Sequence, residues 1–212
     1  MVNQTRPLIT YSRKDKYAIV VDLLQGRTGT LLDVGARDRI LSRLLDLQAL
    51  AYYSADLGPG HDYQLDLEEK LSLADHSFDY VVALDVLEHV EHIHQAFHEL
   101  ARITRQRLII ALPNMATLPR RWSFLWRGNL GTHKYDLLPE HQGDRHRWLT
   151  VYSQINAFVK DSADQTELTL VQVVEQLEAG PLMARLGYWL AQRGMLPDGW
   201  LTGRCIYVMA RK

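Results

Sequence analysis

The chain has 212 residues, with 24 lysines and arginines against 25 aspartates and glutamates, so its formal net charge is −1. A nearly neutral chain lacks the basic excess that non-specific nucleic-acid binding requires. Its one cysteine, Cys205, excludes an internal disulfide framework and a thiolate metal cluster. The length favours a single domain over residues 1–212, and no apolar run approaches a membrane span, so we expect a cytoplasmic protein with no membrane partner.

The first predicted element is an amphipathic helix over residues 14–25, where apolar side chains recur at helical spacing between charged ones. Gly26 and Gly29 end it. Residues 1–13 are polar, and their pattern leaves open whether they fold over a ligand or trail from the domain.

Residues 31–41 carry the strongest local pattern. A buried apolar run turns at Gly35, and apolar residues then recur at helical spacing from Ile40 to Leu47. The pattern predicts a strand, a tight turn and a helix, with Asp38 placed to cap the helix. In an open α/β sheet such a turn lies at the carboxyl end of a strand, where ligands bind.

An acidic residue ends the next predicted strand, residues 52–56. Asp56 follows Asp33 by 23 residues, close to the spacing at which a carboxylate binds a nucleotide ribose. A dinucleotide loop would also need three glycines at fixed spacing, but Arg37 and Arg39 stand in the open positions. The sequence therefore favours a ribose over a pyrophosphate and argues against a nicotinamide oxidoreductase.

These residues resemble the first motif of the class I S-adenosylmethionine-dependent methyltransferases, which usually reads Asp-x-Gly-x-Gly-x-Gly. Asp33 and Gly35 match this motif, whereas Arg37 and Arg39 depart from it. The resemblance implies that Asp33 and the backbone at Gly35 hold the amino-acid end of the cofactor and that Asp56 binds the ribose. The cofactor-binding residues it implies are Asp33, Val34, Gly35, Ala36, Arg37, Asp56, Leu57, Asp66, Leu67, Asp85 and Val86.

The adenine end of this set depends on a short third strand predicted at residues 63–67. In the family an acid at this point contacts the adenine amino group, which makes Asp66 the matching residue and Leu67 an apolar neighbour of the ring. The alternative is a solvated loop aspartate.

Residues 78–84 form an almost wholly apolar run, as expected of a strand covered on both faces. With the letters Leu-Glu-His-Val that follow, this stretch is similar to the family's fourth strand. Asp85 should border the cofactor, and His89 is the candidate catalytic base, because a neutral imidazole can remove a proton near pH 7. A histidine that only contacts a nearby backbone group or acid is the alternative.

The spacing Asp85-x-x-Glu88-His89 also resembles the Glu-x-x-Glu-His box of the small-RNA 2′-O-methyltransferases and the ubiquinone-biosynthesis O-methyltransferases, where these residues hold a divalent ion. Aspartate replaces the first glutamate here and no fourth ligand is evident, so we assign no metal. His94 and His98 share one helix face but alternate with charged residues, which favours a solvated surface.

The fifth strand, residues 107–114, leads into an insertion at residues 115–150 that is rich in basic and aromatic residues. Long inserted segments are often lids or binding loops, and we predict that Asn114, His146 and Arg147 bind the acceptor. Alternatively Asn114 only completes its turn, and a helix at residues 117–127 places its tryptophans in the core. The insertion loosely resembles that of the MetW-type methyltransferases.

Later in the chain we predict a helix at residues 151–160, a strand at 168–175, a helical apolar face within 181–194 and a last strand at 204–210. The resemblance implies an α/β fold, a three-layer α/β/α sandwich with a Rossmann-like, seven-stranded, mostly parallel sheet whose last strand is antiparallel. The implied function is methyl transfer from S-adenosylmethionine to an unidentified small-molecule acceptor by a monomer or homodimer. The alternative is a catalytically inactive partner protein with this fold.

Overall fold

We describe a computed structural model of the chain, covering residues 6–135, 145–178, 189–190, 193, 195 and 197–212. Eight strands form one sheet: β1 (Leu8–Ser12), β2 (Gly29–Val34), β3 (Leu50–Asp56), β4 (Tyr63–Gln64), β5 (Phe78–Leu84), β6 (Thr104–Pro113), β7 (Leu168–Leu177) and β8 (Thr202–Arg211). The helices are α1 (Lys16–Leu24), α2 (Ile40–Leu44), η1 (Leu87–His89), α3 (Ile93–Ile103), α4 (Leu118–Arg127), η2 (His133–Tyr135) and α5 (Tyr152–Asp164). None of the helices in these ranges is long and apolar enough to cross a bilayer.

The strands lie in the order β1-β7-β8-β6-β5-β2-β3-β4. All neighbours are parallel except β8, which runs antiparallel to both β6 and β7. The predicted antiparallel last strand is thus confirmed. Because β2 pairs with β3 on one side and with β5 on the other, the direction of winding reverses at β2. The carboxyl ends of β2 and β5 therefore flank the crevice in which open α/β sheets bind their ligands.

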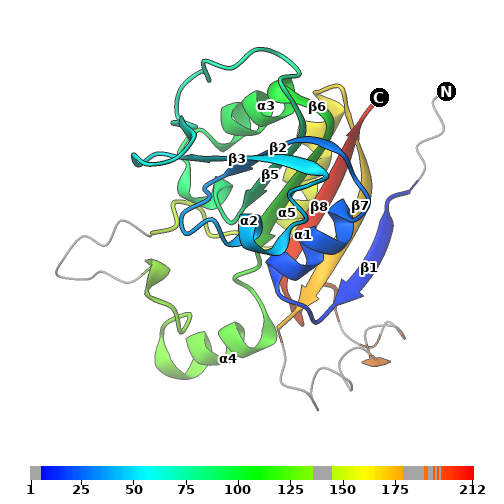
Figure 1. Cartoon of the computed structure of the whole chain (residues 1–212). Coiled ribbons are helices and arrows are strands. Elements are labelled where there is room, and N and C mark those ends of the chain that lie inside the picture. Colours follow the sequence, from blue (N-terminus) through cyan, green and yellow to red (C-terminus); the bar gives the residue numbers. More distant parts are fainter. Residues whose placement is uncertain (1–5, 136–144, 179–188, 191–192, 194, 196) are drawn as a thin grey trace.

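Two apolar cores lie on opposite faces of this sheet (Figure 1). Alternate residues of β2 separate them, because successive side chains of a strand point to opposite faces: Leu32 packs with α3 and α5, and Leu31 packs with α1 and α2. Strand β5 is buried along its whole length, as its apolar run predicted. The three-layer sandwich follows from this division and matches the fold class expected from the sequence.

The described sheet has one strand more than the seven expected. Residues 8–12, placed in an undecided polar terminus, form β1 and pair in parallel with β7. An edge strand is held by main-chain hydrogen bonds, which hydropathy does not reveal. The strand predicted at residues 63–67 is shorter, because only Tyr63 and Gln64 pair with β3.

The helix after the Gly35 turn also differs from its prediction. It covers only Ile40–Leu44, and the residue before it is Arg39 in the left-handed region, with no side-chain cap. The expected Asp38 cap is therefore wrong, because the turn is one residue longer than the pattern suggested. Helix α1 does have a side-chain N-cap: the Asp15 carboxylate accepts hydrogen bonds from the backbone N–H groups of Tyr17 and Ala18.

Candidate active site

The turn after β2 brings the first motif against the next strand. Gly35 has a φ of +73°, and a Cβ there would lie 2.4 Å from Cγ2 of Val86, so the turn requires glycine. Its N–H and that of Ala36 donate to the carbonyl of Ala55 on β3, at 2.8 and 3.1 Å. Arg37 also adopts a positive φ, +41°. The loop is thus folded tightly onto the tip of β3.

Asp56, at that tip, accepts a hydrogen bond from the backbone N–H of Arg37 at 3.0 Å and one from the N–H of Leu57 at 2.8 Å. The two bonds fix the carboxylate at the mouth of the crevice. Arg39, which departs from the family motif, turns away and donates from its guanidinium to the carbonyl of Gly60. Its side chain does not line the cavity described below.

Asp33 lies beneath the turn and is 5% exposed. Its carboxylate accepts a hydrogen bond from the Tyr52 hydroxyl at 2.8 Å. Burial raises the pKa of its carboxyl group to about 6, against the lowering effects of Tyr52 and of the Lys16 charge. Asp33 therefore supports the turn from beneath and does not line the cavity.

Asp85 follows β5 and is held by two cations. Lys16 of α1 contacts one carboxylate oxygen at 2.9 Å, and Arg204 of β8 contacts the other at 2.6 Å. Burial alone would raise the pKa of Asp85, but these two charges hold it below its ordinary value. Asp85 has a φ of +58°, so the backbone reverses directly after the strand. The ion pairs place Lys16 and Arg204 in the same cavity wall.

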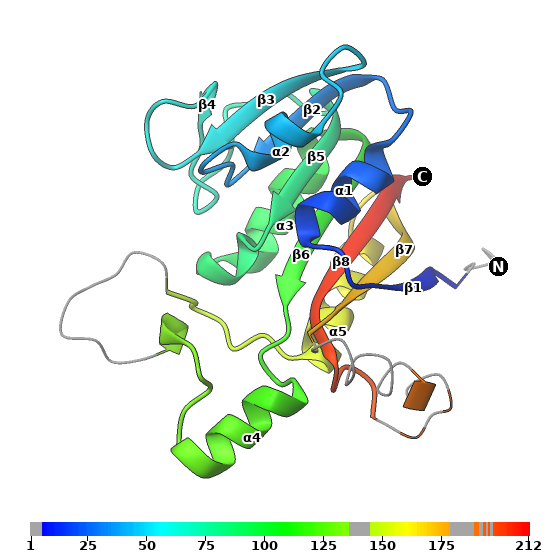
Figure 2. The ribbon, with the colours of Figure 1, turned by 60° about the horizontal axis from the view of Figure 1, so that its bottom comes forward.

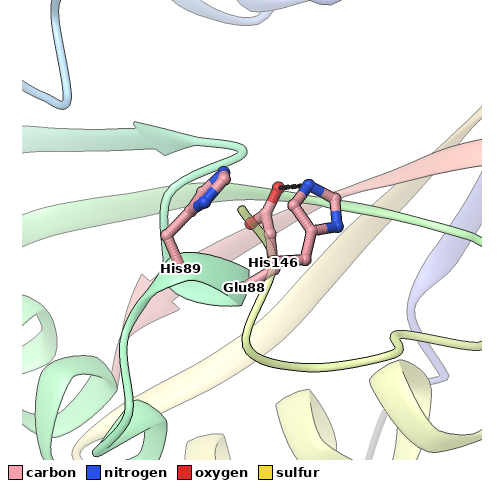
Figure 3. A group of neighbouring side chains, drawn as sticks. All are labelled: Glu88, His89 and His146. Carbon is pink, nitrogen blue, oxygen red and sulfur yellow. Dashed lines mark ion pairs between the residues drawn. The ribbon is translucent and has the colours of Figure 1, made fainter. Parts of the chain in front are cut away.

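Glu88, His89 and His146 meet just beyond this reversal, where η1 lies against residues 145–147 (Figure 3). One potential ligand atom from each lies within 4.8 Å of the others. Glu88 is fully buried, and neither carboxylate oxygen has a hydrogen-bond partner; Nε2 of His146 lies 3.8 Å from one of them. Burial, with a further contribution from the Asp85 charge, raises the pKa of Glu88 to about 8.

The hydrogen bonds of the two imidazoles define their tautomers. His89 Nδ1 lies 2.8 Å from the Arg145 carbonyl, which can only accept, so Nδ1 carries the proton. The Tyr135 hydroxyl donates to the Trp148 carbonyl at 2.6 Å and therefore accepts from Nδ1 of His146 at 3.1 Å. With Nδ1 as the donor, each ring in its neutral form has its lone pair on Nε2, and this is the form of imidazole that acts as a base or a metal ligand.

A cavity of about 520 Å³ joins these groups, a size common among small-molecule sites. Of the residues predicted from the sequence, those that line it are Gly35, Arg37, Asp56, Leu57, Asp85, Val86, His89 and His146. The wall is completed by residues that the sequence reasoning did not assign to the site, although it named Glu88 in the possible metal box: Lys16, Tyr17, Leu84, Glu88, Pro113, Met115, Arg120, Thr132, Lys134 and Arg204. Lys16 and Arg204 belong to no motif that could have indicated their role, because only the fold brings them to Asp85.

Several other predicted residues lie elsewhere. Asn114 is 1% exposed, and its amide is engaged by Gly199, Thr202, Ala116 and Tyr152. These contacts are those of the alternative in which Asn114 completes its turn, and Asn114 does not line the cavity. The remaining predicted residues outside the cavity lining, besides Asp33, are Val34, Ala36, Asp66, Leu67 and Arg147.

Two of these residues have clear structural roles. Leu67 is buried in the core, and exposed Arg147 pairs with Glu91 at 3.0 Å and donates to the His89 carbonyl at 3.1 Å. Arg147 thereby helps to hold residues 145–147 against η1.

The described part of the 115–150 insertion places α4 apart from the sheet layers (Figure 2). No residue of α4 is buried, so the alternative that put its tryptophans in the core is wrong. Most of the helical face predicted within 181–194 lies outside the described residues. Arg120, Thr132 and Lys134 connect the insertion to the cavity.

Comparison with known proteins gives one family match and several structures of the same fold. Residues 32–112 match the family model described as "Methyltransferase domain". No curated protein matches the chain in sequence. Among solved structures, the methyltransferase domain of bacterial CtHen1 aligns with a TM-score of 0.61 at 15% identity, covering 92% of this chain and 97% of that one.

Two further structures have the same fold. Magnesium protoporphyrin IX methyltransferase from Synechocystis PCC 6803, solved with bound SAH, aligns with a TM-score of 0.56 at 17% identity over 92% of this chain and 82% of that one. The CurJ carbon methyltransferase aligns with a TM-score of 0.55 at 16% identity over 92% of this chain, which spans 54% of that longer one. Residues 32–112 of this chain therefore match the methyltransferase domain family, and the described chain has the fold of the class I S-adenosylmethionine-dependent methyltransferases.

Proposed function

We propose that this protein transfers the methyl group of S-adenosylmethionine to an oxygen or nitrogen atom of a small-molecule acceptor. The observation that carries the proposal is the cavity at the β2/β5 crevice, which is lined by Asp56, fixed at the β3 tip, and by Asp85 and His89. The family match at residues 32–112 supplies the cofactor class.

Asp56 is assigned to the ribose hydroxyls, because an ionised carboxylate accepts two hydrogen bonds from a vicinal diol while its backbone bonds keep it in place. The backbone of the Gly35 turn forms part of the cavity wall. A side chain at this position would collide with Val86. Lys16 and Arg204 neutralise Asp85 and fix it at the end of β5. These contacts prepare the cavity before any ligand enters.

The sulfonium of S-adenosylmethionine supplies an activated methyl group and keeps the electron pair of the broken S–C bond, leaving S-adenosylhomocysteine. The acceptor's lone pair forms the new bond to carbon, and its proton must leave. Nε2 of His89 takes that proton, while the Arg145 carbonyl stabilises the imidazolium through Nδ1–H. Alignment of the acceptor and removal of its proton are the protein's share of the chemistry.

The test is calorimetric titration of S-adenosylhomocysteine into Asp56→Ala, with Asp46→Ala as the matched control. Asp46 is exposed and accepts a single local backbone bond from Gln48, before β3 begins. We expect Asp56→Ala to weaken binding by about 100-fold or more and the control to change it by less than about twofold. Equal affinities in all three proteins would overturn the assignment.

A turnover assay distinguishes the proposed enzyme from the alternative, a partner protein that has this fold but no catalytic activity. The wild-type protein, incubated with methyl-labelled S-adenosylmethionine and a panel of phenols, carboxylic acids and amines, should release S-adenosylhomocysteine when an acceptor of the right class is present. Ligand binding with no product in any arm would favour the partner protein.

The cluster of Glu88, His89 and His146 supports a second candidate role, binding of a divalent cation. Glu88 is buried with no hydrogen bond to either oxygen, and both imidazoles donate Nδ1–H to an oxygen, the arrangement usual for metal-binding histidines. Asp85, the first residue of the box noted in the sequence, is engaged by two cations and is not part of this set. A cation here would polarise an acceptor oxygen.

Titration of Mn²⁺ and Zn²⁺ into the metal-free protein separates the two roles. A stoichiometric site that Glu88→Gln removes and Glu91→Gln retains would favour the cation; Glu91 is the matched control because it is exposed and pairs with Arg147. Absence of binding by the wild-type protein would leave His89 as the base.

A further inference from the structure

Helix α4 exposes an unusual set of side chains. Trp122, Phe124, Leu125 and Trp126 are each between 59% and 70% exposed on a helix of ten residues. Trp122, Leu125 and Trp126 stand three and four residues apart and so share one face, and the two indole rings lie 5.5 Å apart. Apolar side chains of this size rarely gather on a surface that only meets water.

The beginning of α4 is fastened to the body of the protein. The N–H of Leu118 donates to the Trp200 carbonyl at 2.7 Å, and Arg120 pairs with Glu178 at 3.3 Å. The Arg121 guanidinium lies 5.7 Å from the Trp200 ring centroid. Beyond this turn the helix extends away from the sheet layers (Figure 2) and ends at Gly128. The apolar face is therefore held outward by specific contacts at one end.

The charged residues within the segment that carries this face have one sign. Residues 115–135 contain Arg120, Arg121, Arg127 and Lys134 and no aspartate or glutamate, in a chain whose net charge is −1. Apolar aromatic residues on one face with arginines beside and behind them are typical of helices that lie in the surface of an anionic bilayer. A second copy of the chain fits less well, because it would bring two cationic segments together.

We propose that α4 is an interfacial helix that docks this protein on an anionic phospholipid bilayer, with the indoles of Trp122 and Trp126 inserted among the acyl chains and Arg121 and Arg127 at the phosphates. Ten helical residues rise only about 15 Å, so the helix lies in the interface and does not cross it. This surface lies outside the cofactor cavity, and the proposal does not depend on the proposed catalysis.

Docking would also fix the orientation of the cavity relative to the bilayer. Arg120, from the first turn of α4, lines the cavity wall together with Thr132 and Lys134, which follow the helix. A bilayer held against α4 would lie beside the part of the wall that these residues form. An acceptor with a membrane-embedded tail and a polar head could enter from that side.

The test is flotation of the full chain with phosphatidylcholine vesicles, with and without about 30% phosphatidylglycerol. We expect binding to the anionic vesicles only, reduced by high salt. Trp122→Ala/Trp126→Ala should reduce the bound fraction about tenfold or more. The matched control is Leu44→Ala/Leu47→Ala, which removes two half-exposed apolar side chains elsewhere and should bind as the wild type does.

Three results would overturn the proposal: no flotation of the wild-type protein, equal flotation of the tryptophan variant, or a dimer in solution that the tryptophan variant converts to monomer. The last would identify a second copy as the occupant of this face. Calorimetry with S-adenosylhomocysteine on the same variants keeps the two proposals apart, because loss of the α4 surface should leave cofactor affinity unchanged.

Discussion

The two walls of the cavity are built in different ways. One, the sheet wall, consists of Gly35, Arg37, Asp56, Leu57 and Asp85, all within three residues of a strand's carboxyl end. The other, the outer wall, consists of Met115, Arg120, Thr132, Lys134 and His146, and no described residue between 114 and 150 belongs to a strand. A sheet ladder fixes the first wall, whereas isolated backbone hydrogen bonds to η1 and Trp200 and side-chain contacts to Glu88 and Glu178 fix the second.

We infer from this difference that the sheet wall serves the cofactor and the outer wall serves the acceptor. The sheet wall carries the groups that any nucleoside cofactor needs, and it falls within residues 32–112, which match the family model. The outer wall lies outside that match and brings histidine, arginine and lysine to the same cavity. Selectivity for the acceptor should therefore reside in residues 115–146.

The largest effect is expected where the two walls meet. His89→Asn keeps a donor for the Arg145 carbonyl but removes the basic Nε2, so kcat should fall by about 10²–10⁴-fold once an acceptor is known. Affinity for S-adenosylhomocysteine should stay within about twofold, because the role proposed for His89 concerns the acceptor and not the cofactor. Steady-state kinetics and calorimetry measure the two quantities. An unchanged kcat would remove His89 from the chemistry and return it to a structural contact.

A pH-dependent effect is expected from the support of the sheet wall. The pKa of Asp33 is raised to about 6 in the folded protein, from 3.8, so ionisation opposes folding as the pH rises between these values. Asp33→Asn keeps an oxygen acceptor for Tyr52 and cannot ionise. The difference in free energy of unfolding between Asp33→Asn and the wild type should shift in favour of the variant by about 2.5 kcal/mol from pH 4 to pH 7. Urea unfolding at several pH values measures this difference, and a constant difference would mean that the carboxyl group titrates normally.

Much of the sheet wall could be predicted from the sequence. The apolar run of β5 and the acids ending β3 and following β5 located Asp56 and Asp85, because the carboxyl ends of parallel strands share one edge. Lys16 and Arg204 could not be found in this way, since their places depend on which strand neighbours which. Nor could the approach of His146 to Glu88, because 57 residues separate them and no periodic pattern spans that distance.

A smaller effect tests the backbone of the sheet wall. Gly35→Ala places a methyl group 2.4 Å from Val86 and forces a non-glycine residue into the left-handed region, so the free energy of unfolding should fall by about 2–3 kcal/mol. Gly60→Ala is the control, because Gly60 also has a positive φ but no atom within 4 Å, and should cost about 1 kcal/mol. Urea unfolding compares the two, and equal losses would mean that Val86 moves aside freely.

The smallest effect is expected at Asp66, which the family resemblance assigned to the adenine. Asp66 lies beyond the end of β4, where its side chain is exposed and accepts from the N–H of Glu68 at 2.9 Å, whereas Leu65 and Leu67 on either side are buried in the core. Asp66→Ala should thus change S-adenosylhomocysteine affinity by less than about threefold in calorimetry, far less than Asp56→Ala. A tenfold loss would mean that Asp66 contacts the bound cofactor, which would require residues 57–66 to move over the adenine when the cofactor binds.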